Sequence, residues 1–172
     1  MFPQTTDGIA ITLLANISNV EEMEKVSECC GAGVGLFRTE LLFMGRNSFP
    51  TEAEQFDFYK KITLKSKNKP VTIRTIDIGG DKQLPYFGLP NEPNPALGYR
   101  AIRICLDRKD IFVTQLKAIL RASIFENFRI MFPMICNVQE IRLAKAVLVE
   151  AENELQSRNI DFNRELTQFI EA

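Results

Sequence analysis

Short apolar segments alternate along the chain with helices that carry their own start signals, and this alternation constrains the fold more than any other feature. Four β-branched or apolar runs predict strands over residues 8–15, 33–38, 71–76 and 129–134. Start signals of the form Ser/Thr/Asn-x-x-Glu open helices at Ser18, Thr51 and Asn137. Each crossover is longer than the ~10 to 12 residues that a parallel connection needs. The expected fold class is α/β, built from parallel βα units.

The helices are expected to bury one face each against the sheet. Val20, Met23 and Val26 recur at a three-residue step behind the first start signal, which gives that helix an apolar stripe. Later helices are expected over residues 96–106, 111–122 and 137–155. The tail, residues 157–172, has no clear periodicity, so its structure is left uncertain.

The number of units bounds the architecture. Four βα units are half of the eight that close a TIM (β/α)8 barrel of typically about 250 residues, although a doubly wound sheet would show the same periodicity. No linker divides the chain, so residues 1–172 are expected to form a single partial domain, the first half of such a barrel. The strands over 8–15 and 129–134 would then be unpaired edges. We therefore expect a homo-oligomer in which the fourth strand of one chain pairs with the first of another, unless the tail covers one edge.

Composition narrows the partners and the compartment. Lys plus Arg at 21 nearly balances Asp plus Glu at 22, so there is no basic excess of the kind that marks nucleic-acid binding. No apolar run approaches the ~20 residues of a membrane span, and residues 1–7 lack the apolar core of a secretion signal. We expect a cytoplasmic protein with neither a nucleic-acid nor a membrane partner.

The count of histidines is zero, which excludes histidine from this chain as base, nucleophile, metal ligand or phosphoryl carrier. The four cysteines show no Cys-x-x-Cys spacing and indicate neither a zinc knuckle nor a redox pair. Any chemistry must therefore come from other side chains.

Two arginines stand where parallel α/β folds bind ligands, at the carboxyl ends of strands. Arg38 ends the second predicted strand and Arg74 lies toward the end of the third. A planar guanidinium can hold a phosphate or a carboxylate through two parallel hydrogen bonds. Spacing alone leaves a second interpretation open, in which Arg38 pairs with Glu40 and Arg74 with Asp77 as structural ion pairs.

Two further arginines follow in the short helical segment. Arg103 can pair with Asp107 at four residues' spacing, whereas Arg100 has no partner that is obvious from the sequence. A Gly-Gly-Asp-Lys turn over residues 79–82 offers backbone amides and an ammonium nearby, although Gly-Gly is more often only a turn.

Several long motifs, in order along the chain, resemble one family. They are Gly-Val-Gly-Leu-Phe-Arg-Thr-Glu-Leu-Leu-Phe-Met over residues 33–44, Pro-Thr-Glu-Ala-Glu-Gln-Phe over 50–56, Ile-Arg-Thr-Ile-Asp-Ile-Gly-Gly-Asp-Lys over 73–82, Asn-Pro-Ala-Leu-Gly-Tyr-Arg-Ala-Ile-Arg over 94–103 and Arg-Ile-Met-Phe-Pro-Met over 129–134. Together they are similar to the phosphoenolpyruvate-binding barrel of Enzyme I, the family of phosphoenolpyruvate-protein phosphotransferases. The resemblance covers about residues 7–155.

The resemblance implies a function and three site residues. In this family the matching arginines bind phosphoenolpyruvate, which assigns substrate binding to Arg38 and Arg74, and Arg100 matches an arginine on the phosphate side of the site. The complete enzyme transfers the phosphoryl group of phosphoenolpyruvate to a protein histidine with Mg²⁺. It thereby starts the sugar phosphotransferase relay, with a histidine phosphocarrier protein as its partner.

The same resemblance shows which parts have no match here. The family's phosphorylated histidine lies in a separate N-terminal domain, and its magnesium ligands and cysteine proton donor come from later strands. No residue of this chain matches them, so no catalytic residue and no metal ligand is assigned. Two hypotheses follow: an enzyme fragment that keeps part of the substrate site and is inactive alone, or a non-catalytic anion-sensing or partner-binding module derived from the barrel.

Overall fold

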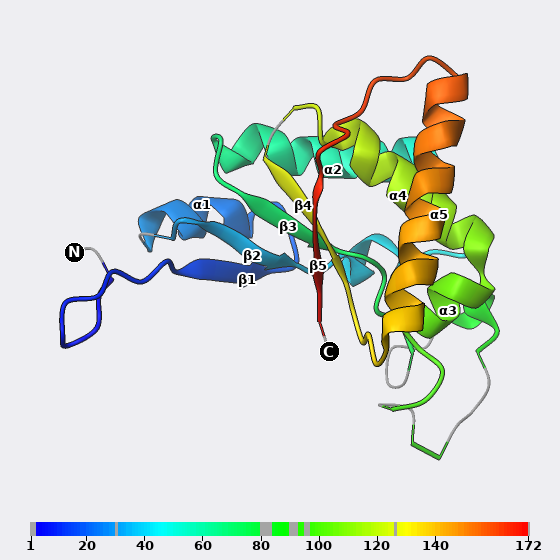
Figure 1. The fold of residues 1–172 in the computed structure, drawn as a ribbon, viewed down its shortest axis with the longest axis horizontal. Coiled ribbons are helices and arrows are strands. Elements are labelled where there is room, and N and C mark those ends of the chain that lie inside the picture. The colour runs from blue at the N-terminus through cyan, green and yellow to red at the C-terminus, as the bar shows by residue number, and fades with distance from the viewer. Residues whose placement is uncertain are drawn as a thin grey trace.

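Five parallel strands form one sheet in the order β1-β2-β3-β4-β5 (Figure 1). The computed structural model describes residues 3–29, 31–79, 84–89, 93–94, 97–125 and 127–171. The strands are β1 (Leu14–Ile17), β2 (Gly33–Phe37), β3 (Val71–Arg74), β4 (Phe128–Phe132) and β5 (Thr167–Ile170). Each neighbouring pair is consecutive along the chain, which confirms the α/β class and the parallel βα units.

The helices between the strands largely follow their start signals. They are α1 (Glu22–Glu28), α2 (Glu52–Ser66), α3 (Ile102–Asp107), α4 (Lys109–Ala122) and α5 (Val138–Ser157), with short 3-10 turns η1 (Glu40–Leu42) and η2 (Pro85–Phe87). Thr51 caps α2 in a reciprocal capping box with Glu54, and Asn137 Oδ1 accepts from the Glu140 amide at the start of α5. Both signals are confirmed.

The first start signal is displaced by one residue. Asn19 Oδ1 accepts from the Glu22 amide at 2.9 Å, and the Glu22 carboxylate accepts from the amides of Ser18 and Asn19. The expected pair of Ser18 with Glu21 is therefore wrong. An Asn side chain serves equally well in this role, and the one-residue shift leaves Met23 and Val26 buried in the core as expected.

The core lies between the sheet and the helices, and α4 packs between α2 and α5. Residues Phe128, Ile130 and Phe132 of β4 are buried, while Arg129 and Met131 on the opposite face are only partly so. The Phe132 ring meets Phe112 of α4 edge to face, with ring centroids 6.0 Å apart. The alternation shows that the helical side of β4 is more completely covered than its other side.

A fifth strand corrects the expectation of four. Residues Thr167–Ile170 of the unassigned tail pair with β4 in parallel, from Arg129 opposite Thr167 to Phe132 opposite Ile170. In Figure 1 this last strand runs along the outer side of β4. The fourth strand is therefore not an edge, because the tail covers it. The edges of the sheet are β1 and β5.

The first strand also begins later than expected. The run over residues 8–15 contributes only its last two residues to β1, and Gln4 and Ala10 instead form an antiparallel bridge within an N-terminal loop. Figure 1 shows this loop extending away from the sheet. The reason is that β2 begins at Gly33, opposite Leu14, so that earlier residues have no neighbouring strand to pair with. Among the described residues, no helix is long and apolar enough to cross a membrane.

Candidate anion site at the carboxyl edge of the sheet

Arg74 is the last residue of β3, and three carboxylates surround its guanidinium. Its Nη2 lies 2.5 Å from Glu40 Oε1 and 3.2 Å from Asp77 Oδ2, while Nη1 lies 3.2 Å from Glu171 Oε2. These carboxylates come from η1, from the loop after β3 and from the residue that follows β5. The sheet therefore brings together three segments that are distant in sequence, as the carboxyl ends of neighbouring parallel strands must.

The Arg74 guanidinium and two of the carboxylates around it are buried, so the charges of this cluster act strongly on one another. Arg74 is 8% exposed, and Glu40 and Asp77 are buried too. Burial by itself would lower the pKa of Arg74, but the charges of Glu40, Asp77 and Glu171 outweigh it and hold that pKa above its ordinary value. Arg74 is thus a fixed cation. Its Nε is buried and has no hydrogen-bond partner within the described part of the chain, so it remains a donor for a ligand or a water.

Arg100 joins the cluster through Asp77. Its Nε and Nη2 donate to Asp77 Oδ1 at 3.1 and 2.8 Å. Gly79 makes this approach possible, because it has a φ of 138° and a Cβ there would overlap the Cβ of Arg100. Asp77 therefore bridges Arg74 and Arg100, and the partner that the sequence left unidentified for Arg100 is this aspartate.

Arg38 directly follows β2 and therefore also lies at the carboxyl ends of the strands. It is exposed, and its Nη2 donates to Ser18 Oγ at 3.2 Å. A cavity of about 190 Å³ opens beside it, lined by Ser18, Arg38, Glu40, Leu41 and Met44. Glu40 belongs both to this cavity and to the Arg74 cluster. Ion pairs connect Glu40, Arg74, Asp77 and Arg100, and Arg38 lines the cavity next to them.

A buried network of hydrogen bonds connects α4 with the carboxyl ends of β2 and β3. Thr39 Oγ1 donates to the Arg74 carbonyl at 3.0 Å and accepts from Gln115 Nε2 of α4 at 3.3 Å. Gln115 Oε1 accepts from the Ile76 amide at 2.9 Å. The backbone after β2 is thereby connected to the backbone after β3.

The described carboxylates at this edge do not fit a metal ion. Glu40, Asp77 and Glu171 each pair with an arginine, and a divalent cation would have to displace those guanidinium groups. Within the described ranges, no group of three His, Cys, Asp or Glu side chains is placed to hold a metal.

The structure brings the three predicted arginines to one edge but changes their partners. Glu40 pairs with Arg74, whereas the sequence suggested Arg38, and the suggested pair of Arg74 with Asp77 is present. Arg103 donates to the Leu97 and Gly98 carbonyls rather than following the expected helical pairing with Asp107. The turn over residues 80–82 lies outside the described residues.

Two members of the site were missed from the sequence. Glu171 is 97 residues from Arg74, and no local pattern connects them. Gln115 does leave a signal, since it is an amide between core positions Phe112 and Leu116 on the buried face of α4. A polar residue on an apolar stripe indicates a buried hydrogen-bond network.

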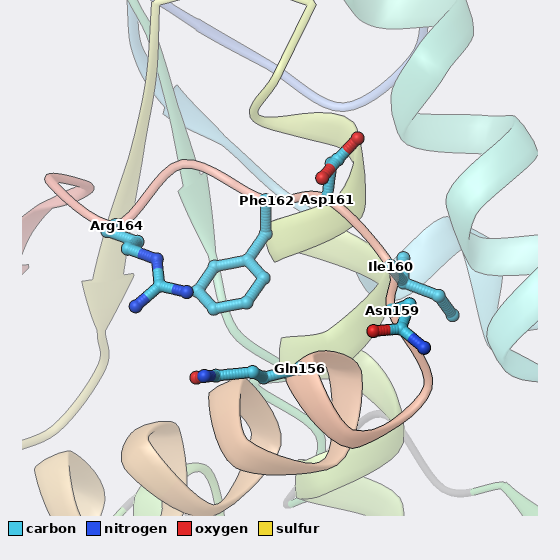
Figure 2. Close-up of a pocket in the computed structure, with 6 residues that line it drawn as sticks. All are labelled: Gln156, Asn159, Ile160, Asp161, Phe162 and Arg164. Carbon is cyan, nitrogen blue, oxygen red and sulfur yellow. The ribbon is translucent and has the colours of Figure 1, made fainter.

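A second pocket of about 230 Å³ lies at the opposite ends of the strands, at the end of α5 and the connection that leads to β5 (Figure 2). It is lined by Gln156, Asn159, Ile160, Asp161, Phe162 and Arg164. The Arg164 guanidinium lies over the Phe162 ring, 5.4 Å from its centroid. This edge holds the amino ends of the strands, whereas ligands of parallel α/β folds bind at the carboxyl ends. The candidate site is therefore the arginine edge.

Comparisons with known proteins agree on a family. The family described as "PEP-utilising enzyme, PEP-binding domain" matches residues 2–171. The phosphoenolpyruvate-protein phosphotransferase of Priestia megaterium is 51% identical over 162 residues, which are 94% of this chain and 28% of that protein. Its counterparts in Buchnera aphidicola and Bacillus subtilis are 53% and 54% identical, over 94% and 87% of this chain and 28% and 26% of their own lengths. The chain thus spans little more than a quarter of these relatives, and it belongs to the family of PEP-utilising enzymes through their PEP-binding domain.

Proposed function

We propose that this chain is part of a phosphoenolpyruvate-dependent protein-histidine phosphotransferase, the cytoplasmic enzyme that starts a sugar phosphotransferase relay, and that it supplies the arginine side of the substrate site. The observation that carries the proposal is that Arg38, Arg74 and Arg100 lie together at the carboxyl ends of a parallel sheet, where Arg38 and Glu40 line one cavity and ion pairs connect Glu40, Arg74, Asp77 and Arg100. The names of the relatives point to the same substrate.

In this proposal Arg38 and Arg74 hold the carboxylate and phosphate of phosphoenolpyruvate, and Arg100 acts on the phosphate side. Phosphoryl transfer depends mainly on positioning and on neutralising charge, which fixed guanidinium groups supply. Arg38 is exposed and lines a cavity in which its guanidinium can contact substrate. The Arg74 Nε has no hydrogen-bond partner among the described residues and can donate to the same ligand. The acceptor histidine, the Mg²⁺ ligands and the proton donor are assigned to the complete protein, as is the contact with the histidine phosphocarrier protein.

We further propose that residues 1–172 are a partial domain, the first units of a TIM barrel. The exposed β5 and β1 are the two edges that further strands or a second copy would cover, in place of the edge once expected at β4. A homo-oligomer in which β5 of one chain pairs with β1 of another is expected for the isolated chain. Light scattering over a range of concentrations tests this, and a monomer at the highest concentration would contradict it.

The substrate proposal is tested by calorimetric titration of the chain with phosphoenolpyruvate, pyruvate and inorganic phosphate. If separate arginines hold the carboxylate and the phosphate, phosphoenolpyruvate binds more tightly than either partial ligand, and more weakly as salt is raised. Equal affinity for phosphate and phosphoenolpyruvate would reject the paired-arginine site.

A second assay tests the assignment of catalysis to other parts of the protein. With phosphoenolpyruvate, Mg²⁺ and the histidine phosphocarrier protein, the isolated chain is expected to release no pyruvate above background. Any enzymatic release that depends on the chain would contradict the assignment. Binding without release is common to the fragment hypothesis and to an anion-sensing module.

A further inference from the structure

Gln115 is a fully buried amide in the middle of α4, and its two polar atoms contact both arginine-bearing segments. Its Oε1 accepts from the Ile76 amide at 2.9 Å. Its Nε2 donates to Thr39 Oγ1 at 3.3 Å and to Tyr59 OH at 3.1 Å. Burial without partners would be costly for a primary amide, so these contacts determine where α4 lies against the two strand ends.

The contacts lie next to the proposed substrate ligands. Thr39 directly follows Arg38, and Ile76 lies two residues after Arg74. Thr39 Oγ1 in turn donates to the Arg74 carbonyl at 3.0 Å, which closes a ring of hydrogen bonds from α4 to β2 and from β2 to β3. The last ladder pair of β2 with β3 is Phe37 with Ile73. Beyond that pair, the ring of side-chain hydrogen bonds connects the two backbones that carry Arg38 and Arg74.

We propose that Gln115 is a positioning residue that sets the placement of Arg38 relative to Arg74. The role requires an acceptor and two donors at one buried point, which only an amide side chain offers among residues of this length. The inference rests on the proposed function insofar as the two arginines bind phosphoenolpyruvate. It adds that the spacing which selects a carboxylate together with a phosphate is determined from α4.

The third contact of Gln115 offers a matched control. Tyr59 OH donates a hydrogen bond to Gln55 Oε1, and Gln55 Nε2 donates to the Pro50 carbonyl. This branch of the network therefore leads toward the start of α2 and away from the arginines. Tyr59→Phe removes one hydrogen bond from the same buried amide and leaves the contacts to Thr39 and Ile76. Gln115→Met keeps the length and volume of the side chain and removes all three contacts.

The test compares Gln115→Met and Tyr59→Phe in the full chain, by titration with phosphoenolpyruvate and with inorganic phosphate. Gln115→Met is expected to lower the affinity for phosphoenolpyruvate at least tenfold. The affinity for phosphate, which needs only one arginine, is expected to change less than threefold. Tyr59→Phe is expected to stay within twofold of the original for both ligands, even if both variants unfold at lower temperature. A purely structural role would lower the melting temperature without changing the ratio of the two affinities. Equal ratios in both variants would overturn the proposal.

A second readout separates this inference from the proposed function. The Nε–H resonances of Arg38 and Arg74 are recorded by nuclear magnetic resonance without ligand. Gln115→Met is expected to shift both resonances and Tyr59→Phe neither. If the original chain fails to bind phosphoenolpyruvate, the proposed function is rejected, and the resonances still decide whether Gln115 positions the arginines. Unchanged resonances in Gln115→Met would reject the positioning role.

Discussion

Two charge clusters of opposite design hold different parts of this molecule. In one, the Arg74 guanidinium is surrounded by Glu40, Asp77 and Glu171 at the ends of the strands. In the other, the Glu52 carboxylate is surrounded by Lys117, Arg121 and Arg158, at 3.5, 2.7 and 3.0 Å, where α2, α4 and the end of α5 meet.

The two clusters differ in burial and in which charge is in excess. The Glu52 cluster is more open to water at one side, where the Arg158 side chain is 50% exposed, and the solvent screens part of its ion pairing. The Arg74 cluster is largely buried, so its carboxylates and guanidinium groups are compensated mainly by one another. The Arg74 cluster lies at the carboxyl ends of the strands, where parallel α/β folds bind ligands, whereas the Glu52 cluster is a contact between helices.

The largest expected effect comes from removing the central cation of the buried cluster. Arg74→Ala leaves Glu40 and Asp77 buried with less compensation, and loss of one partner of a buried pair typically costs about 3 to 5 kcal/mol. Urea denaturation of the variant and the original chain measures the loss in the free energy of unfolding. A loss smaller than that caused by Glu52→Gln would show that the contrast between the clusters is wrong.

The next effect falls on binding rather than on stability. Arg38 is exposed, so Arg38→Ala is expected to change the free energy of unfolding by less than about 0.5 kcal/mol. Loss of a charged hydrogen-bond donor costs about 1.5 to 3 kcal/mol of binding, which is a weakening of roughly 10- to 150-fold for phosphoenolpyruvate. Calorimetry measures it, with Lys145→Ala, an exposed cation of α5, as the control of equal charge change. Equal affinities in the two variants would exclude Arg38 from the site.

Glu52→Gln tests how much the Glu52 cluster contributes to the free energy of unfolding and how that contribution depends on pH. Burial alone would raise the pKa of Glu52, but hydrogen bonds from Arg158 and Arg121, with the charges of Arg158 and Lys117, lower that pKa below its ordinary 4.5. A lowered folded-state pKa stabilises the protein above the unfolded value, and that contribution is lost as pH falls through the folded value. The variant is expected to lose about 0.2 to 1 kcal/mol at pH 7.

The difference between Glu52→Gln and the original chain should shrink once the pH falls below about 4.5. Hydrogen bonds from Arg46 and Thr51 hold the pKa of Glu54 at about 2, and this group titrates alike in both proteins and cancels. Urea denaturation at pH 7 and at pH 3 gives the two differences. A difference that grows as the pH is lowered would contradict the assigned sign.

The smallest effect on binding is expected at Glu171, where a substitution should raise the affinity instead of lowering it. This carboxylate has a side chain 41% exposed and pairs with Arg74 at 3.2 Å, where it would compete with the anionic ligand of the proposed site. Glu171→Gln should therefore strengthen phosphoenolpyruvate binding, by no more than about fivefold for an exposed ion pair. Calorimetry against the original chain measures the change. Weaker binding in the variant would indicate that Glu171 supports the site instead of competing for it.

The elements that could be predicted from the sequence depend on interactions between near neighbours. The capping contacts of Thr51 and Asn137 span three residues, and the buried Met23 and Val26 lie along α1, so the pattern alone predicts them. Val20 is buried too, although it precedes the helix. The parallel α/β class follows from the order of such elements. The arginines at strand ends were predictable too, because residue type and position in a strand are local facts.

What the sequence could not determine is which distant segments meet. The strand Thr167–Ile170 is exposed at all four residues and has no alternation, so only its pairing with β4 defines it. The partners of Arg74 were decided in the same way, since Glu171 reaches it only because β5 lies beside β4. Sequence by itself determined the fold class, the helix starts at Thr51 and Asn137, and Arg38 and Arg74 of the proposed site, while the family resemblance added Arg100. Tertiary structure alone decided the fifth strand, the ion pairs and the buried Gln115 network, because each depends on the packing of segments that are remote along the chain.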